Sequence, residues 1–147
     1  MKTGIAGLNL IKQYEGFRSK PYLCPAGVPT IGWGSTVYPD GRKVSLRDKA
    51  ITENVAEEIL RATLTKYEDA VNRYARVKLN QNQFDALVSF AYNLGIGALQ
   101  KSTLLKRVNE SNFVAASREF GKWVNAGGKV LKGLVNRRAA EKALFLS

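Results

Sequence analysis

The residue types that this chain lacks restrict the chemistry that it could perform. Its 147 residues include no histidine and only one cysteine, Cys24. The absence of histidine excludes a Ser-His-Asp triad, a Cys-His protease pair and a zinc-binding HExxH helix. A single cysteine excludes an intrachain disulfide and a cysteine-based metal cage, so we expect no metal and no cofactor. Any catalysis must therefore rest on carboxylates, hydroxyls or the one thiol.

A glutamate near the N-terminus is a candidate acid catalyst. Glu15 is the only acidic residue before Asp40, and it lies at the predicted end of a first helix. The C-terminal end of a helix dipole is negative and does not stabilise a carboxylate, which modestly favours a functional reason for this residue. Taken alone, a glutamate is more often an ordinary surface residue than a catalytic one.

The residues after Glu15 follow a recognisable spacing. Cys24 stands nine positions after Glu15, and Thr30 stands six positions after Cys24 and opens the run TIGWG at 30–34. This pattern resembles the catalytic signature of the phage-type lysozymes of glycoside hydrolase family 24. Most members of that family carry an aspartate where this chain has Cys24.

Later segments resemble the same family, so the resemblance extends over most of the chain. They are the stretch QFDALVSFAYNLG at 83–95, KSTL at 101–104 and NRRAAE at 136–141. The resemblance implies an enzyme, a lysozyme that hydrolyses the β-1,4 bond between N-acetylmuramic acid and N-acetylglucosamine in bacterial peptidoglycan. It also implies the role of an endolysin, which lyses the bacterial host of a phage.

The resemblance assigns a role to each residue of the signature. Glu15 is the implied general acid, because a glycosidic oxygen leaves only when it receives a proton. Cys24 replaces the aspartate that stabilises the oxocarbenium ion or activates water, and Thr30 holds that water through its hydroxyl. We expect an inverting single displacement, with a covalent thioglycosyl intermediate on Cys24 as the alternative. Without the signature, Cys24 would be a small buried hydrophobe and Thr30 an ordinary strand residue.

The resemblance also implies a set of substrate-binding residues in the second half of the chain. The family pairs its catalytic glutamate with a C-terminal arginine, which makes Arg137 the implied partner of Glu15. Tyr92 is equally compatible with packing, and Arg137 with a solvated helix surface. The implied substrate-binding residues are Tyr92, Asn93, Ser102 and Arg137.

Hydrophobic periodicity and turn residues predict an α+β, mostly helical domain. All four prolines lie within residues 17–41, which indicates a small antiparallel sheet with tight turns. We expect one lysozyme-like domain over 1–147, with a small β-lobe at about 17–44 and a helical lobe at about 45–147 plus the N-terminal helix. A cleft between two such lobes is a natural ligand site. The expected helices cover residues 3–15, 52–75, 80–94, 102–109, 112–123 and 133–145.

Four capping signals place the expected helix ends. Thr3 could cap the first helix, and Ser45 with an aspartate three residues later resembles another helix start. Asn80 with Gln83 resembles a capping box, and Gly95 suits the position after a helix end.

The net charge of +11 and the sequence pI of about 10.0 predict attraction to polyanions. We expect peptidoglycan and the anionic bacterial envelope as partners and no nucleic acid, because no recognition motif accompanies the charge. No run of 18 apolar residues is present, so no transmembrane segment is expected. We expect a monomer that is made in the host cytoplasm and reaches the cell wall through a holin pore. The alternative is a basic, non-catalytic domain that binds peptidoglycan or nucleic acid.

Overall fold

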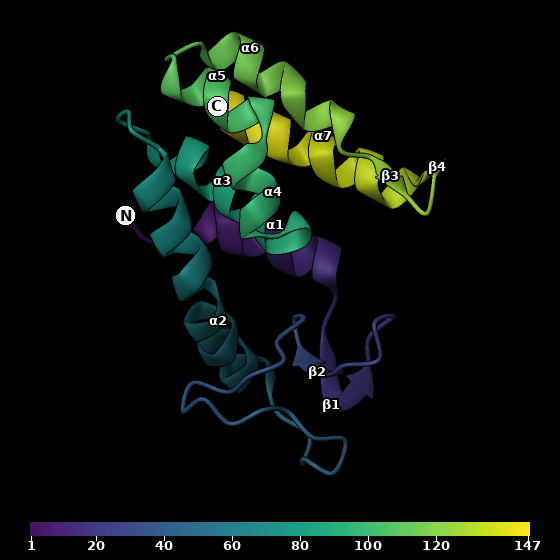
Figure 1. Cartoon of the computed structure of the whole chain (residues 1–147). Coiled ribbons are helices and arrows are strands. Elements are labelled where there is room, and N and C mark those ends of the chain that lie inside the picture. Colours follow the sequence, from purple (N-terminus) through teal and green to yellow (C-terminus); the bar gives the residue numbers. More distant parts are fainter. The chain divides into compact units, whose positions relative to one another are not determined.

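The computed structural model describes all 147 residues, which form two compact units (Figure 1). The helical unit comprises Met1–Leu10 and Tyr67–Ser147, and the hairpin unit comprises Ile11–Lys66. The boundaries fall within two helices, α1 (Ile5–Glu15) and α2 (Glu53–Tyr74). The expected mostly helical α+β fold with a small antiparallel sheet near the N-terminus is confirmed.

The hairpin unit holds the small sheet. Strands β1 (Arg18–Leu23) and β2 (Pro29–Gly32) pair antiparallel, with Tyr22 opposite Thr30. The register shifts between Arg18 and Tyr22. Pro21 lies within this shifted stretch and lacks the N–H that a regular ladder needs. The two strands are therefore paired regularly only next to the turn, where Leu23 lies opposite Pro29.

The helix start suggested at Ser45 is wrong, because this segment forms a turn. Asp48 Oδ2 accepts hydrogen bonds from the Ser45 N–H at 2.9 Å and from the Tyr38 hydroxyl at 2.7 Å. Serine and aspartate favour such turns as readily as helix starts, because their short side chains bond nearby backbone groups. Helix α2 begins after Thr52, within one residue of the start predicted at 52, and the Thr52 hydroxyl oxygen accepts the Val55 N–H at 3.2 Å.

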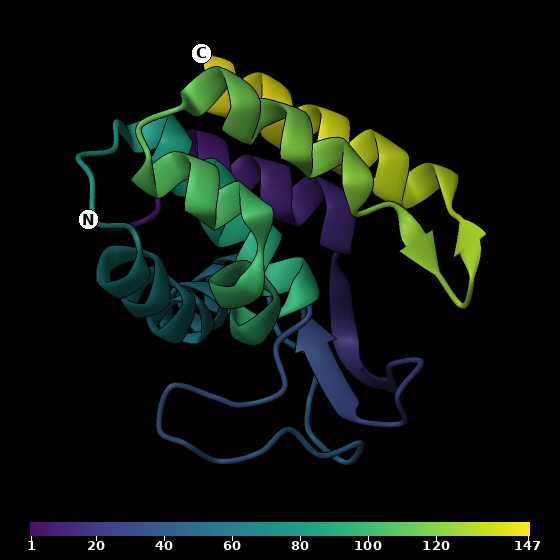
Figure 2. The ribbon, with the colours of Figure 1, turned by 45° about the horizontal axis from the view of Figure 1, so that its top comes forward.

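The helical unit contains most of the remaining helices, and α7 packs against α3 and α6 (Figures 1 and 2). The helices predicted near 80–94, 102–109, 112–123 and 133–145 are present. A short helix and a small second hairpin were not predicted. The elements are α3 (Gln81–Leu94), α4 (Ile96–Lys101), α5 (Thr103–Asn109), α6 (Phe113–Glu119), the 3₁₀ turn η1 (Phe120–Lys122), β3 (Asn125–Ala126), β4 (Lys129–Val130) and α7 (Lys132–Leu146).

Buried aromatic rings form the centre of the helical unit. Phe90 of α3 lies 5.8 Å from Phe120 of η1 between ring centroids, and Phe120 lies 5.5 Å from Phe145 of α7. All three rings are buried. Such tilted and edge-on aromatic pairs add to the stabilisation that burial already gives. This cluster fixes α7, and therefore its charged residues, against α3.

The predicted caps of α3 are confirmed at both ends. The Asn80 side chain accepts the Gln83 N–H at 2.8 Å, and the Gln83 side chain accepts the Asn80 N–H at 2.9 Å. At the other end, Gly95 has a φ of 99°, and its N–H donates to the Ala91 carbonyl at 2.7 Å. Reciprocal capping satisfies donors that the first helical turn would otherwise leave unpaired.

The start of α1 is held by other helices, and the prediction that Thr3 caps it is wrong. The Thr3 N–H and hydroxyl both donate to the buried carboxylate of Glu68, at 2.7 and 2.6 Å. The fully buried Asp85 of α3 accepts instead from the N–H groups of Gly4 at 3.0 Å and Gly7 at 3.1 Å. A carboxylate at a helix N-terminus satisfies unpaired donors and interacts favourably with the helix dipole.

This contact makes Gly7 intolerant of a side chain. A Cβ at Gly7 would lie 2.7 Å from Asp85 Cβ and 2.9 Å from Thr3 Cγ2. Alanine would gain about 1 kcal/mol of helix propensity, but overpacking and a displaced carboxylate cost more. We expect Gly7→Ala to lower the free energy of unfolding by about 2 kcal/mol, measured by urea denaturation.

Gly133 of α7 offers a matched control. A Cβ there would meet no heavy atom within 4 Å, and its φ is not positive. Gly133→Ala should therefore raise the free energy of unfolding, by up to about 1 kcal/mol. Equal effects of the two substitutions would show that Asp85 does not hold α1 in the way described.

Candidate active site

Glu15 is the last residue of α1, as predicted. Gly16 follows it with a φ of 74°, and the Gly16 N–H donates to the Lys12 carbonyl at 3.0 Å. A glycine in this left-handed conformation commonly ends a helix. The half-buried Glu15 side chain therefore stands where the helix stops and the chain turns into β1.

Cys24 occupies the first position of the turn that joins β1 to β2. The Gly27 N–H donates to the Cys24 carbonyl at 2.8 Å, and the Cys24 N–H donates to the Val28 carbonyl at 3.1 Å. Pro25 has the fixed φ that suits the second position of such a turn, and Gly27 has a φ of 76°. Three-residue hairpin loops place a left-handed residue at this point. The hairpin thus fixes the backbone of Cys24 on both sides.

The residues of the turn lower the pKa of the Cys24 thiol. The Val28 N–H has the largest effect and lowers the pKa of the Cys24 thiol. Desolvation opposes it with the next largest effect, and the Ala26 N–H and the Thr30 hydroxyl lower the pKa further. Donors aimed at an anion stabilise its charged form. They would favour a carboxylate at this position for the same reason, which makes the turn compatible with either residue type.

Thr30 of β2 lies beside Cys24. It is buried, and its hydroxyl donates to the Val28 carbonyl at 2.8 Å. A hydroxyl has one proton, so donation to Val28 leaves the oxygen free to accept, while a charged Cys24 would draw the same proton to itself. The Thr30 hydroxyl can therefore adapt to either protonation state of the thiol.

Tyr22 is a neighbour of the site that the sequence did not single out. Burial is the main reason that the pKa of Tyr22 is raised. The Arg18 guanidinium, 4.3 Å from the centre of the Tyr22 ring, opposes this rise. The charges of Glu15 and Cys24 add to the rise, so both of these residues lie within electrostatic range of the Tyr22 hydroxyl. A tyrosine opposite Thr30 in a two-stranded sheet gives no sequence signal of its own.

The four residues implied to bind substrate all belong to the helical unit. Tyr92 packs edge-on against Tyr67, with ring centroids 5.2 Å apart, and the Asn93 side chain accepts from Arg138 Nη2 at 2.7 Å. Ser102 is buried and caps α5, since its hydroxyl accepts the Leu105 N–H at 3.0 Å and donates to a backbone carbonyl of α4. These contacts are all made within the protein, and the substrate-binding roles of the four residues stay predictions.

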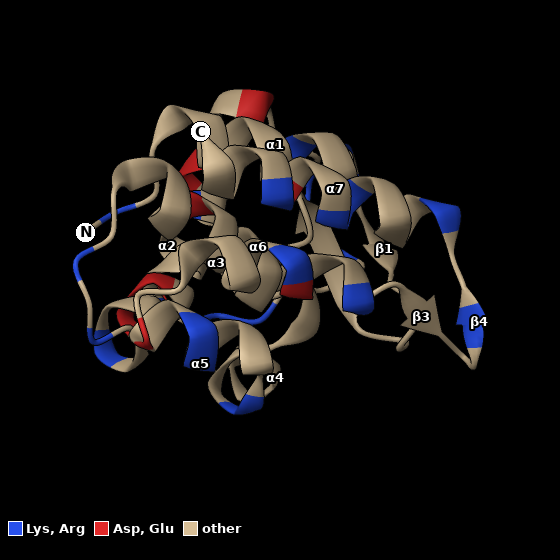
Figure 3. Ribbon diagram, turned by 90° about the horizontal axis from the view of Figure 1, so that it is seen from above, with Lys and Arg blue, Asp and Glu red and all other residues tan.

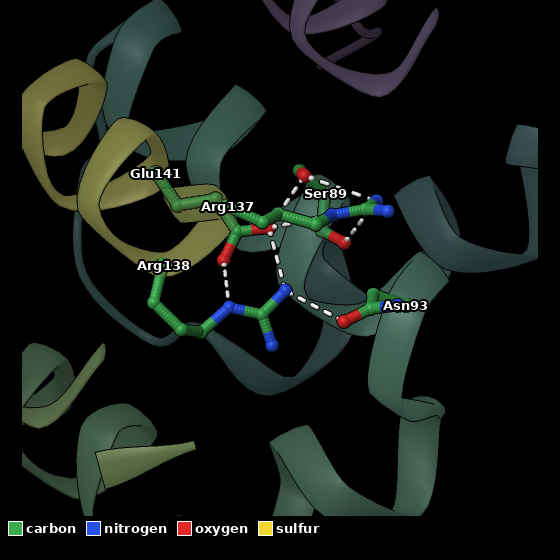
Figure 4. A network of polar contacts seen from close by, with 5 residues as sticks. All are labelled: Ser89, Asn93, Arg137, Arg138 and Glu141. Atoms are coloured by element: carbon green, nitrogen blue, oxygen red, sulfur yellow. Dashed lines mark hydrogen bonds and ion pairs between the residues drawn. The ribbon is translucent and has the colours of Figure 1, made fainter. Parts of the chain in front are cut away.

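Arg137 belongs to a buried polar network in which Glu141 is the only acid (Figure 4). One Glu141 oxygen accepts from the Ser89 hydroxyl at 2.6 Å, from Arg138 Nη2 at 3.2 Å and from Arg137 Nε at 3.4 Å. The other oxygen lies 2.8 Å from Arg138 Nε. Arg137 also donates to the Ser89 carbonyl at 3.4 Å.

The charges of this network act on one another because they are buried. Desolvation raises the pKa of the Glu141 carboxyl, and Arg138, Ser89 and Arg137 oppose that rise. Desolvation also lowers the pKa of Arg138, which Glu141 counteracts. A buried ion pair of this kind rigidifies its surroundings only while every partner is present. The network fixes Asn93 and Arg137 in place, and the sequence analysis missed Ser89, Arg138 and Glu141 as its members.

No group of three or more histidine, cysteine, aspartate or glutamate side chains is arranged to hold a metal ion. None of the helices combines the length and the hydropathy that crossing a membrane requires.

The fold and the residues of the hairpin unit define a class, a lysozyme-like fold with a glutamate at the end of its first helix. Residues 12–141 match the family described as Phage lysozyme. The endolysin of Salmonella phage P22 is 42% identical over 147 residues, covering 100% of this chain and 99% of that protein. The chain therefore belongs to the phage lysozyme family.

Other relatives agree with this assignment. The structure of the endolysin from Escherichia coli O157:H7 phage FAHEc1 superimposes with a TM-score of 0.91 at 40% identity, covering 100% of this chain and 94% of that chain. The endolysin of Bacillus phage B103 is 46% identical over 155 residues, covering 100% of this chain and 55% of that protein. The chain thus spans about half the length of the B103 endolysin and of its Bacillus phage PZA counterpart.

Proposed function

We propose that this chain is a lysozyme of the endolysin type, which hydrolyses the β-1,4 bond between N-acetylmuramic acid and N-acetylglucosamine in bacterial peptidoglycan and thereby lyses the host cell. Membership of the phage lysozyme family supports the activity. The observation that carries the residue roles is the β1–β2 turn, whose backbone hydrogen bonds hold Cys24 in place near the buried Thr30. The turn lowers the pKa of the Cys24 thiol, and the charges of Cys24 and Glu15 both act on Tyr22.

The proposed reaction is a single displacement. Glu15 donates its proton to the glycosidic oxygen as the bond between that oxygen and the anomeric carbon breaks. The oxygen of a water molecule held by the Thr30 hydroxyl bonds to the anomeric carbon from the opposite face. The proton that the water loses passes to the Cys24 thiolate, which the turn donors stabilise. The configuration at the anomeric carbon is inverted.

Substrate binding and location complete the proposal. Tyr92, Asn93, Ser102 and Arg137 would contact the saccharide or, for Arg137, pair with Glu15. The net charge of +11 supports residence on the anionic wall of the bacterium, which the chain would reach from the host cytoplasm through a holin pore, as a monomer and without binding nucleic acid.

Substitutions at Cys24 test the assigned roles. On purified peptidoglycan, we expect Cys24→Asp to retain activity and Cys24→Ala to lose about tenfold or more, because alanine can neither accept the proton nor stabilise positive charge. The pKa of Cys24 is lowered, so the thiolate fraction and the activity of the unmodified chain should rise with pH at values below the ordinary thiol range. Cys24→Asp should lack this rise, because its carboxylate is ionised throughout.

The products of the same reaction identify the bond that is cleaved and the stereochemistry of cleavage. New reducing ends on N-acetylmuramic acid would identify the bond, and first-formed product with retained configuration would contradict the single displacement. Equal activity of Cys24→Asp, Cys24→Ser and Cys24→Ala would return Cys24 to a packing role. Binding to peptidoglycan without release of reducing ends would favour the non-catalytic binding domain.

A further inference from the structure

The helical unit contains a cavity of about 600 Å³ between the end of α2, the end of α4 and α5. Of the residues proposed for the lysozyme reaction, only Ser102 borders it, and the Ser102 hydroxyl is engaged as the cap of α5. The volume falls within the range typical of small-molecule sites and exceeds what a bare inorganic anion needs. The cavity is therefore large enough for an organic ligand.

The lining of this cavity is strongly basic. Arg76, Lys101 and Lys106 contribute exposed side chains to it, and none of the three has an ion-pair partner in the structure. Figure 3 shows the basic segments on α4 and α5. The only acidic residue of the lining is Glu110, whose carboxylate lies 2.8 Å from Arg107 Nη1. Three cations without counter-charges attract a multiply charged anion such as a phosphate ester.

One side chain of α5 holds the opposite wall in position. The Asn109 side chain accepts the Arg76 backbone N–H at 2.7 Å and donates to the Tyr74 carbonyl at 3.0 Å. These bonds fix the backbone on which Arg76 and Tyr74 stand, while leaving the Arg76 guanidinium available. A wall that is ordered before the ligand arrives lowers the entropy lost on binding.

The remaining lining groups are those that recognise hydroxyls. Gln100 and Thr103 present an exposed amide and an exposed hydroxyl, and Tyr74 presents a half-buried aromatic ring. Amide and hydroxyl groups can donate to and accept from the hydroxyls of a polyol, and an aromatic face packs against its carbon skeleton. The cavity thus combines a phosphate-binding side with a polyol-binding side.

We propose that this cavity binds a phosphorylated polyol or sugar, whose phosphate contacts Arg76, Lys101 and Lys106 and whose hydroxyls contact Gln100 and Thr103. The site is distinct from bond cleavage and does not depend on it. Such ligands occur as repeating units of anionic polymers and as free small molecules, and they share the chemistry that this lining recognises.

Glycerol 3-phosphate is the probe for the test, titrated into the full chain in low-salt buffer without phosphate and followed by NMR amide shifts. We expect a dissociation constant of about 1 mM or tighter, with the shifts clustered on α4, α5 and residues 74–76. Arg76→Gln combined with Lys106→Gln should weaken binding about tenfold. Both substitutions leave the backbone bond to Asn109 intact.

Arg118→Gln combined with Lys142→Gln is the matched control, because it removes two exposed cations from α6 and α7, outside the cavity. If this control variant binds glycerol 3-phosphate within about twofold of the unmodified chain, the result supports the site. An equal loss of affinity in both double variants would show that binding reflects general charge attraction, and it would overturn the proposal. Inorganic phosphate bound as tightly as glycerol 3-phosphate would overturn the polyol part.

Two further binding measurements identify the source of the ligand and test whether its binding depends on the proposed lysozyme activity. Tighter binding of poly(glycerol phosphate) than of glycerol 3-phosphate would identify a polymer as the source, and equal binding a free phosphate ester. Glu15→Gln should bind the probe as the unmodified chain does. The binding test of the cavity can therefore fail or succeed independently of the test of the proposed lysozyme activity.

Discussion

Glu15→Gln should reduce the release of reducing ends from purified peptidoglycan by about 10²- to 10⁴-fold, the range that a general acid contributes. Glutamine has nearly the same shape as glutamate, but its amide cannot give a proton to the leaving glycosidic oxygen. The loss should appear in turnover, with binding to insoluble peptidoglycan preserved. The structure places Glu15 at the end of α1, followed by the left-handed Gly16, so the substitution leaves the helix end unchanged.

Glu58→Gln is the control for this experiment. Glu58 belongs to the same hairpin unit, is exposed and undergoes the same chemical change. It should retain activity within about twofold, since an isolated surface carboxylate contributes little. Glu15→Gln activity within about tenfold of the unmodified chain, in a variant whose thermal unfolding is unaltered, would mean that another group supplies the proton.

Glu141→Gln should lower the free energy of unfolding by about 3–5 kcal/mol, the cost of breaking a buried ion pair by removing one partner. The side chains that hydrogen-bond to Glu141 all donate to it, namely Ser89, Arg137 and Arg138. A glutamine amide would replace one accepting oxygen by a donor and leave two buried guanidinium groups without a counter-charge. Urea unfolding followed by tryptophan fluorescence measures the effect.

The exposed ion pair of Arg107 and Glu110 has the same three-residue spacing as the buried pair of Arg138 and Glu141, and it serves as the control. Glu110→Gln should therefore cost less than about 1 kcal/mol, because solvent screens the exposed pair. Ser89→Ala is the milder companion variant, expected to cost about 1–2 kcal/mol by leaving one accepting position of Glu141 unmet. Similar small losses in Glu141→Gln and Glu110→Gln would show that burial does not strengthen this network.

The features that the sequence predicted correctly depend on residues close together in the chain. The capping box of Asn80 and Gln83 spans three residues, and both partners can be read from their types. Glu15, Cys24 and Thr30 lie within 16 residues, and the predicted helix end at Glu15 and the predicted hairpin after it are both present in one unit. The catalytic roles of the three residues stay predictions.

The errors arose where distant or competing partners decide. Thr3 has the right type for a cap, but its hydroxyl donates to Glu68, 65 positions later, and Asp85 takes its expected place. The Ser45 segment carries a signal that helices and turns share, and the bond from Tyr38 to Asp48 accompanies the turn. Tertiary partners of this kind leave no periodic trace in a sequence.

The buried polar network was missed for a related reason. Arg138 and Glu141 are of the residue types that most often face solvent, and their three-residue spacing is typical of a surface pair. Only the packing of α7 against α3 shows that both are buried and that Ser89 joins them. Similarly, the donors around Cys24 come from the backbone of the turn, which residue types alone do not reveal.

The anchoring of α1 has a consequence for the order in which this chain can fold during synthesis. The hydrogen bond from Gly4 to Asp85 joins residues 81 positions apart, and that from Thr3 to Glu68 joins residues 65 apart. Chains are made at about 5–20 residues per second, and contacts of such long range form slowly. The first turn of the helix that carries Glu15 must therefore wait several seconds, until more than half of the chain has left the ribosome. A nascent chain stopped before Glu68 would contain Glu15, Cys24 and Thr30, but the helix that ends at Glu15 would lack both the Glu68 and the Asp85 anchors at its start.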